Sequence, residues 1–266
     1  MPTTMIDRSY TRSTRPLLLV IAALALACSL VTAGSAYAQT IHHVDASATG
    51  ASDGSSFTNA YTNLQDALAT ATGNDVIVIA GGTYLPTTNA SDRDARFDIT
   101  GAQDGLKIYG GWAGTESFAT IDDVESKLDD RDLAANPTVL SGDIDNNDNT
   151  NASGITEDAS DIQGENSYTV VYLDGTTGGT ITTGTVLDGL VITGGQANDT
   201  RISSPSSNGA GGGAYCDGNG NDNECSPQFT NIVFAGNTAG RFGGGALQHW
   251  AARHKQPPSY KRDLYR

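Results

Sequence analysis

The residues best suited to chemistry lie in one acidic segment, GDIDNNDNTN. Four of them offer carboxylate or amide oxygens, the ligands that calcium prefers: Asp143, Asp145, Asn147 and Asp148. The EF-hand pattern does not apply, because Asp148 stands where that pattern requires Gly and Gly154 where it requires Glu. The sequence therefore predicts a calcium site of another kind at these four residues. A solvated acidic loop without metal is the alternative interpretation.

Cleavage of a polysaccharide is a second chemistry to consider. A lyase needs carboxylates that hold calcium and a Lys or Arg base, and a hydrolase needs two or three carboxylates on one face. The candidates in the body of the chain are Asp188, Arg93, Arg96, Arg131, Arg201 and Arg241. No nucleophile elbow, phosphate-binding loop or dinucleotide fingerprint accompanies them, so no catalytic residue is assigned. Five aromatic residues are suited either to sugar rings or to the core: Tyr84, Tyr109, Trp112, Phe118 and Tyr172.

Two cysteines, Cys216 and Cys225, enclose the polar stretch DGNGNDNE. In an exported protein such a pair is expected to form a disulfide. Because the enclosed loop is short, we expect this bridge to fasten a loop and to add only a few kcal/mol.

The first 38 residues resemble a secretory signal peptide. Three arginines precede an apolar stretch, Leu17 to Leu30, and the small-residue motif Ala36-Tyr37-Ala38 follows it. The predicted cleavage lies between Ala38 and Gln39. A membrane anchor is the alternative interpretation, and no later segment is apolar and long enough to cross a bilayer as a helix. We therefore expect a protein that is secreted or displayed on the outer-membrane surface.

The charge of the chain is strongly acidic and unevenly distributed. The formal net charge is −15; residues 39–248 carry 28 Asp and Glu against 7 Lys and Arg, whereas residues 249–266 carry 1 Asp against 5 Lys and Arg. An acidic body argues against nucleic acid and against anionic membrane surfaces, which both require basic patches.

The elements that would position these groups are mostly short strands separated by Gly, Asn or Asp. Residues Asn63–Gly73 have apolar side chains at helical spacing, and Gly73 is placed to end that helix. The following run, Val76 to Ala80, is apolar without interruption, which predicts a strand covered on both faces. A helix before a series of strands is what a stacked repeat protein needs to close its first edge.

Internal similarity supports a stacked architecture. LDGLVITGGQA, from Leu187, and FTNIVFAGNTA, from Phe229, are 42 positions apart, which we interpret as two coils of a solenoid. TVLSG at Thr138 and TVLDG at Thr185 are 47 positions apart, close to two coils with a small insertion. Glycine runs, GGGAY and GGGAL, follow the two long copies. A β-sandwich is the alternative fold.

The predicted organisation is an all-β, right-handed parallel β-helix at residues 39–248, with a cap at about 39–86 and coils at about 87–248. We expect Gly194 and Gly236 to turn the chain and Asn237 to stack in an amide ladder. Residues 249–266 fit no repeat and predict a disordered basic tail, an altered reading frame or a truncated protein.

The segment VDASATGASDGSSFTNAYTNLQDALATATGNDVIVIAGGTYLP resembles the opening of exported bacterial β-helix proteins of the pectin-lyase-like class, including the polymorphic outer-membrane-protein type. LKIYGGWAGTES, TVLSGDI, LDGLVITGG and the two glycine runs extend the resemblance over most of residues 44–247. It implies a secreted or cell-surface module for adhesion, surface display or binding of an extracellular polysaccharide or surface glycan. A calcium-dependent polysaccharide lyase, or another carbohydrate-active enzyme of this fold, is the alternative.

Overall fold

The structure is a computed structural model of the chain, and it describes residue 1 and residues 39–199, 208–220 and 223–250. The chain divides into two units, Met1–Ala38 and Gln39–Arg266. The predicted signal peptide, with Ala38 of its cleavage site, lies almost wholly outside the described residues, whereas Gln39 is described and exposed.

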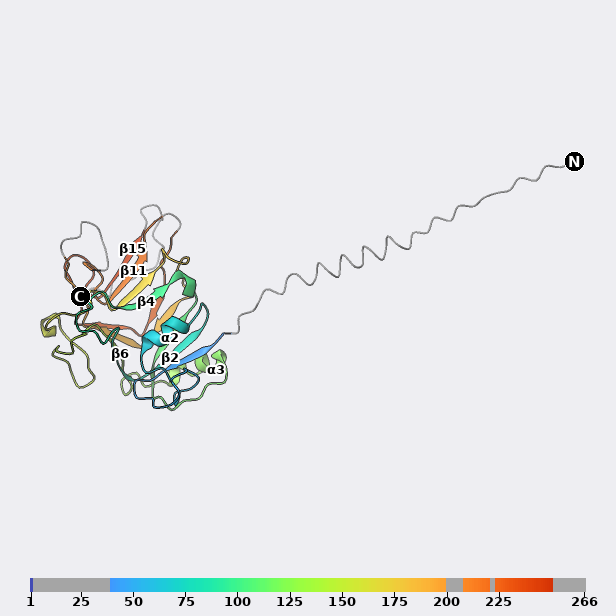
Figure 1. Cartoon of the computed structure of the whole chain (residues 1–266), viewed down its shortest axis with the longest axis horizontal. Helices are drawn as coiled ribbons and strands as arrows, with labels where there is room; N and C mark the ends of the chain where they lie inside the picture. The colour runs from blue at the N-terminus through green and yellow to red at the C-terminus, as the bar shows by residue number, and fades with distance from the viewer. Residues whose placement is uncertain (2–38, 200–207, 221–222, 251–266) are drawn as a thin grey trace. The chain divides into compact units, whose positions relative to one another are not determined.

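Most strands of the second unit belong to three parallel sheets (Figure 1). Sheet A contains β1 (Ile41–Val44), β2 (Val76–Ala80), β5 (Lys107–Trp112), β8 (Val186–Asp188) and β12 (Gln228–Thr230), in this order. Sheet B contains β3 (Gly82–Tyr84), β6 (Thr138–Ser141), β9 (Leu190–Thr193) and β13 (Val233–Ala235). Sheet C contains β4 (Phe97–Thr100), β7 (Val171–Asp174), β11 (Ala214–Gly218) and β15 (Ala246–Trp250). A small parallel pair joins β10 (Gln196–Ala197) to β14 (Thr238–Ala239).

From β2 onwards the chain visits sheets A, B and C in turn and then returns to sheet A. Each return places the new strand beside the strand of the previous circuit, because β2, β5, β8 and β12 are successive neighbours. Parallel strands need such long connections, since a tight hairpin can join only antiparallel strands. The predicted predominance of strands in parallel sheets is therefore confirmed. Strands β2 and β3 already belong to this pattern, although they lie within the range predicted as the cap.

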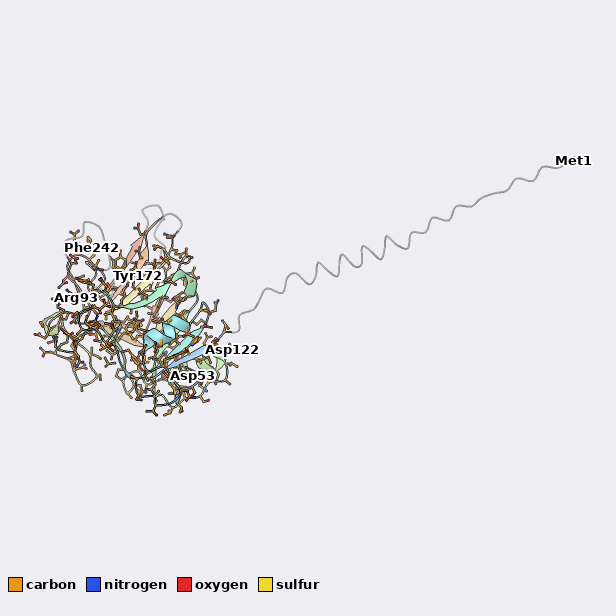
Figure 2. All side chains as sticks on the ribbon, viewed as in Figure 1. Met1, Asp53, Arg93, Asp122, Tyr172 and Phe242 are labelled. Carbon is orange, nitrogen blue, oxygen red and sulfur yellow. A yellow bond between two sulfur atoms is a disulfide. The ribbon has the colours of Figure 1, made fainter. Side chains whose placement is uncertain are left out.

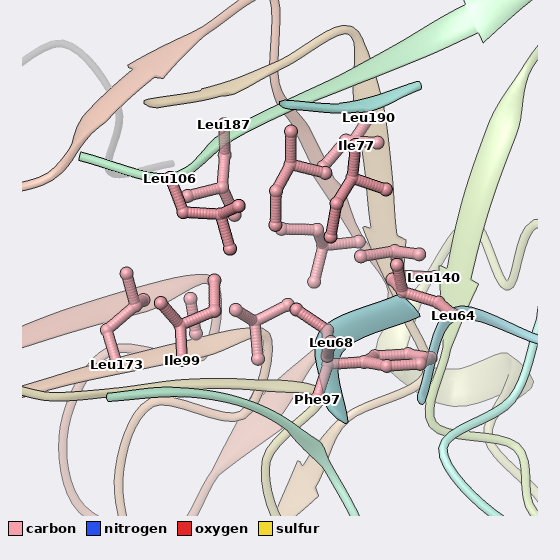
Figure 3. Packing of buried hydrophobic residues seen from close by; sticks show 14 of the residues in the cluster. Leu64, Leu68, Ile77, Phe97, Ile99, Leu106, Leu140, Leu173, Leu187 and Leu190 are labelled. Atoms are coloured by element: carbon pink, nitrogen blue, oxygen red, sulfur yellow. The ribbon is translucent and has the colours of Figure 1, made fainter. Parts of the chain in front are cut away.

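The main core consists of inward side chains that repeat in register from strand to strand (Figure 3). In sheet A, Ile77, Ile108, Leu187 and Phe229 occupy equivalent positions. Sheet B contributes a second series through Tyr84, Leu140, Ile192 and Phe234. Such side chains remove apolar surface from water on every circuit, at about 25 cal/mol per Å².

A second apolar layer covers the outer face of sheet A. All five residues of β2 are buried, but Ile77 and Ile79 belong to the main core, whereas Val76, Val78 and Ala80 pack with Tyr109 and Trp112. The short helices α3 (Ile121–Ser126) and η2 (Leu128–Asp130) contribute Val124 and Leu128 to this layer. The uninterrupted apolar run therefore marks a strand buried on both faces, as predicted.

Helix α2 (Leu64–Thr70) packs against β1 and β4. Asn63 caps it by accepting a hydrogen bond from the Asp66 amide, and Leu64, Ala67 and Leu68 are buried. The predicted end at Gly73 is wrong, because the chain turns extended at Ala71. Glycine is required at position 73 for space: an added Cβ would lie 2.5 Å from the Asp104 carbonyl oxygen. Two further short helices, η1 (Gly101–Gln103) and η3 (Ala159–Asp161), lie in connections.

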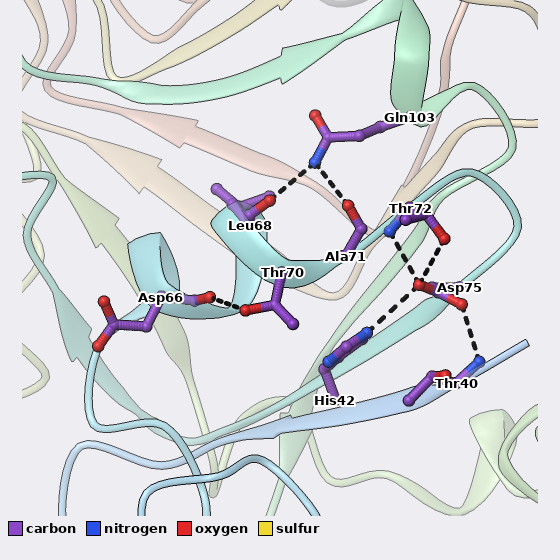
Figure 4. A network of polar contacts seen from close by, with 9 residues as sticks. All are labelled: Thr40, His42, Asp66, Leu68, Thr70, Ala71, Thr72, Asp75 and Gln103. Atoms are coloured by element: carbon purple, nitrogen blue, oxygen red, sulfur yellow. Dashed lines mark hydrogen bonds and ion pairs between the residues drawn. The ribbon is translucent and has the colours of Figure 1, made fainter.

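Asp75 fastens the first strand and the end of α2 to β2 (Figure 4). Its carboxylate accepts hydrogen bonds from the Thr40 amide and from the amide and hydroxyl of Thr72, at 2.8–2.9 Å. His42 Nε2 lies 3.3 Å from the same carboxylate. Burial alone would raise the pKa of Asp75, but these hydrogen bonds outweigh it and lower the pKa.

The pairing corrects the interpretation of the internal repeats. The 42-residue offset spans one circuit and not two, because Leu187 lies directly beside Phe229 and Ile192 beside Phe234. The 47-residue similarity does not reflect stacking at all, since Thr138 of sheet B lies beside Leu190 and not beside Thr185. Long connections between the strands make each circuit longer than the coil of about 20 residues that is typical of a β-solenoid.

The predicted glycine turns are confirmed, but the predicted amide ladder is wrong, because Asn237 lies beside Gly195 and bonds only backbone groups of the neighbouring circuit. Gly194 and Gly236 have φ values of 70° and 54°, the left-handed region that glycine adopts without strain. The Asn237 amide donates to the Ile192 carbonyl and accepts from the Gly195 amide, so it joins two successive circuits. The repeat pattern extends slightly further than predicted, because β15 includes His249 and Trp250. Residues 251–266 of the predicted tail lie outside the described residues.

Candidate functional site

The predicted calcium residues lie in the connection that follows β6. Asp143 is buried, and its carboxylate accepts hydrogen bonds from the backbone amides of Asn147 and Asp148, at 3.0 and 3.1 Å. The structure therefore brings three of the four residues together in one turn. This arrangement makes the Asp143 carboxylate the centre of the turn.

The other two carboxylates hold the far end of the same loop. Asp145 accepts from the Asn147 side chain and from the Glu165 amide. Asp148 has three donors, the Gln163 amide, the Thr156 hydroxyl and the Asn166 side chain, at 2.7–2.9 Å. These contacts close a loop of more than twenty residues on itself without a regular sheet.

The electrostatics of this loop leave the calcium prediction open. Burial raises the pKa of Asp143, and the nearby charge of Asp148 and the contact with Asp145 add to the effect. The Oδ1 atom of Asp145 is buried and has no hydrogen-bond partner among the described residues. However, within the described ranges no three His, Cys, Asp or Glu side chains converge so that they could hold a metal ion. Calcium at Asp143, Asp145, Asn147 and Asp148 stays a prediction.

The predicted disulfide is present between Cys216 and Cys225, whose Cα atoms are 5.7 Å apart. Both half-cystines are buried and belong to the main core. The bridge joins β11 of sheet C to the segment that leads into β12, where Cys225 lies beside Ile181. It therefore reinforces the core, whereas the sequence suggested only a fastened loop.

The outer face of sheet C carries a row of polar and aromatic side chains, of which the sequence reasoning named Arg96 and Tyr172 but missed the neighbours. Register aligns Asp98, Tyr172 and Tyr215 on adjacent strands, and Asp174 with Asp217 one step further along. We call these five residues, together with Arg96, the sheet C face. Tyr172 is labelled in Figure 2. The signal was present: in FDIT, VYLD and AYCDG every second residue is inward and apolar, which leaves the alternate positions outside.

The aromatic rings of the sheet C face are already stacked. Tyr172 and Tyr215 are parallel, with ring centroids 5.7 Å apart, and the Arg96 guanidinium lies 3.6 Å from the centroid of the Tyr172 ring. The Tyr172 hydroxyl donates to Asp217 at 3.0 Å. Both faces of the Tyr172 ring are covered and Tyr215 is only 1 % exposed, so this face offers carboxylate groups to a ligand but not an open ring for stacking.

The carboxylates of the sheet C face differ in acidity. Partial burial raises the pKa of Asp98, although Arg96 opposes the shift. Burial acts in the same direction on Asp174, but hydrogen bonds from Thr176 and Thr177 outweigh it and lower the pKa. Two carboxylates whose pKa values are shifted apart are the usual arrangement of an acid and a base.

The arginines considered for a lyase are engaged elsewhere. Arg93 pairs with Glu165 at 2.6 Å, Arg96 with Asp98 at 2.7 Å, and Arg131 with Asp188 at 2.8 Å. Each of these guanidinium groups is therefore held in place by a carboxylate of the chain itself. Arg241 has interactions of its own, and Arg201 lies outside the described residues.

Most of the aromatic residues considered for sugar binding fill the interior. Tyr84, Tyr109 and Trp112 are at most 4 % exposed. Phe118 packs edge-on against Trp112, with centroids 4.8 Å apart. Burial and the neighbouring Glu125 and Asp188 carboxylates raise the pKa of Tyr109 to about 12.

An open hollow lies between sheet B and the loop of the predicted calcium site. Its lining consists of small and polar residues: Gly81, Gly82, Thr83, Ala113, Ala135, Asn136, Pro137, Ala152, Ser153 and Gly154. None of these lining residues is an acid, a base or a thiol.

Comparison of the chain with protein-family models, with curated proteins and with solved structures produced no match in any of the three.

Among the described residues, no helix has the length and apolar character needed to span a membrane.

Proposed function

We propose that the chain from Gln39 onwards is a right-handed parallel β-helix that is exported and acts outside the cell, as a secreted or surface-displayed module. The cyclic order of sheets A, B and C, with each strand beside its counterpart from the previous circuit, carries this proposal. The signal-peptide pattern of residues 1–38 and the disulfide are consistent with an oxidising compartment. The resemblance to the polymorphic outer-membrane-protein type adds the expectation of surface display.

The role that this geometry supports best is non-enzymatic binding of a glycan along the sheet C face. Asp174 and Asp217 are partners in register on neighbouring strands, which lie about 4.8 Å apart, and Asp98 lies on the next strand, two residues before the partner of Asp174. Carboxylates at such a spacing accept hydrogen bonds from the hydroxyl groups of a neutral sugar chain. A polyanionic chain would be repelled unless a cation intervened, so the proposal specifies neutral or amino sugars.

A glycan array and titration calorimetry test this proposal. We expect the purified protein to bind one or more neutral or amino-sugar polymers, and Asp174→Asn to weaken binding at least about tenfold. Asp129→Asn is the matched control, because it makes the same change in a different exposed segment. Failure of every glycan to bind, or equal weakening by the control, would contradict the proposal.

A carbohydrate-active enzyme is the second candidate, and the opposite pKa shifts of Asp98 and Asp174 favour it. A hydrolase would release reducing ends and a lyase would release unsaturated uronides. We expect the lyase assay to be negative, because Arg93, Arg96 and Arg131 are all paired with carboxylates. Release of reducing ends that Asp98→Asn abolishes would replace the binding role with a hydrolytic one.

A further inference from the structure

Two buried oxygen atoms in the connection between β6 and β7 have no hydrogen-bond partner among the described residues. One is Oδ1 of Asp145 and the other is Oδ1 of Asn166. Asn166 is fully buried, with an exposure of 0 %. Buried acceptors are normally paired, so these two oxygen atoms need a donor or a cation that the described chain does not supply.

The orientation of the Asn166 amide is fixed by its neighbours. Its nitrogen donates to Asp148 Oδ2 at 2.9 Å and to the Gly194 carbonyl at 2.7 Å. A carboxylate and a carbonyl only accept hydrogen bonds, so the amide nitrogen must face them and the amide oxygen cannot take its place. Asn166 therefore reaches into the acidic turn of residues 143–148 with its nitrogen satisfied and its oxygen unpaired.

Two of the residues in this acidic turn are already occupied by the chain itself. Both oxygens of Asp148 accept hydrogen bonds, Oδ1 from a backbone amide and Oδ2 from the Thr156 hydroxyl and the Asn166 amide. Asn147 is exposed, and its side-chain nitrogen donates to Asp145 at 2.9 Å. These contacts make Asp148 and Asn147 groups that position their neighbours.

The carboxylates of Asp143 and Asp145 keep oxygen lone pairs for a ligand. Each Asp143 oxygen accepts a single backbone amide, at 3.0 and 3.1 Å, although a carboxylate oxygen can accept more than one donor. The two carboxylates also contact each other, which is one of the causes that raise the pKa of Asp143. No Lys, Arg or His of the described residues forms an ion pair with either of them. A cation between two such carboxylates would replace their repulsion with attraction.

We propose that this connection binds a calcium ion through oxygen atoms of Asp143, Asp145 and Asn166, with water completing the coordination. Asn166 is the new ligand, whereas Asn147 and Asp148 orient the site and do not bind the ion. Two carboxylates and one amide agree with the finding that no three His, Cys, Asp or Glu side chains converge among the described residues. Calcium accepts such an irregular set of oxygen ligands, whereas magnesium requires a near-ideal octahedron. The proposal is independent of glycan binding, because the sheet C face does not take part.

Isothermal titration calorimetry of the purified protein with calcium chloride tests the site, and magnesium chloride is the comparison. We expect a dissociation constant of about 0.1 mM for calcium, as in extracellular calcium modules, and weaker binding of magnesium. Asn166→Ala removes the unpaired oxygen and should raise the dissociation constant for calcium at least about tenfold. Thr156→Val is the matched control, because it removes another donor to Asp148 but no proposed ligand, and it should leave the dissociation constant unchanged.

Asp145→Asn is a second variant that keeps the shape of the side chain, so the test does not depend on the folding of Asn166→Ala. It should weaken calcium binding by a similar factor. Absence of calcium binding by the unaltered protein would overturn the proposal. Calcium binding that both variants leave unchanged would also overturn it, because the ion would then lie at another acidic segment. If Asn147→Ala weakened binding as strongly as Asn166→Ala, the amide ligand would be Asn147 and the proposed ligand set would be wrong.

Discussion

The Arg131 guanidinium donates to the Asp188 carboxylate over 2.8 Å, and the two side chains are only 3 % and 9 % exposed. Arg131 also donates to the Gly110 carbonyl, and Asn231 donates to the same Asp188 oxygen. This buried pair ties the segment after η2 to strand β8 of sheet A. Removal of one buried charge leaves its partner uncompensated.

We therefore expect Arg131→Ala to lower the free energy of unfolding by about 3–5 kcal/mol. Urea unfolding followed by circular dichroism measures this change. Lys127→Ala is the control, because it removes an ion pair with Asp123 whose side chains are 40 % and 30 % exposed. The control should cost less than about 0.5 kcal/mol, and equal losses in the two variants would contradict the importance of burial.

Loss of the disulfide should destabilise the chain although the fold has its own core. Nine positions separate Cys216 from Cys225, and closing a loop of that size is worth about 2–3 kcal/mol. The double change to alanine should lower the free energy of unfolding by at least this amount, because both sites are buried. Reduction of the unaltered protein with dithiothreitol should have a similar effect, and unchanged unfolding after confirmed reduction would refute this expectation.

His43 should make stability depend on pH. Burial lowers its pKa below 6.5 in the folded protein, although the hydrogen bond with Gly54 opposes the shift. The folded state then binds protons less readily than the unfolded state, so this contribution is present above about pH 6.5 and is lost as the pH falls through the lowered pKa. Thermal melts from about pH 7.5 to 5 should show falling stability, and His43→Phe should flatten the curve. An equally steep curve in His43→Phe would assign the effect to other groups.

Calcium should raise the melting temperature if the loop after β6 holds the ion. Binding at a hundred times the dissociation constant is worth about 2.7 kcal/mol, and Asp145→Asn should remove the gain. Differential scanning calorimetry in millimolar calcium and in chelator measures it. Asp161→Asn, in the same connection, is the control. Identical melting temperatures in calcium and in chelator would eliminate the predicted site.

The sequence predicted the features that depend on local pattern. The apolar run from Val76 to Ala80 requires cover on both faces, and Gly194 and Gly236 adopt the left-handed turns that glycine favours. The disulfide followed from two cysteines nine positions apart. These inferences succeeded because each depends on residues that are close in the chain.

The predictions that were wrong or missing concern the alignment of strands from circuits of unequal length. The similarity of Thr138 and Thr185 suggested equivalent strands, but Thr138 is in sheet B and the strand after Thr185 is in sheet A. The arrangement of the sheet C face could not be predicted because Asp98 and Tyr172 meet only through the register of strands that are 74 residues apart. Spacing along the sequence cannot identify residues that pair across adjacent strands until the length of each connection between strands is known.

The loop between β6 and β7 has a consequence for engineering. The carboxylates of Asp143, Asp145 and Asp148 accept hydrogen bonds from within the loop, while β6 and β7 keep continuous registers with their neighbours on later circuits. The tip at Ala152 and Ser153 is exposed. A foreign peptide grafted there would be presented on a rigid scaffold whose strand pairing is unaffected, so the molecule is suited to carrying epitopes.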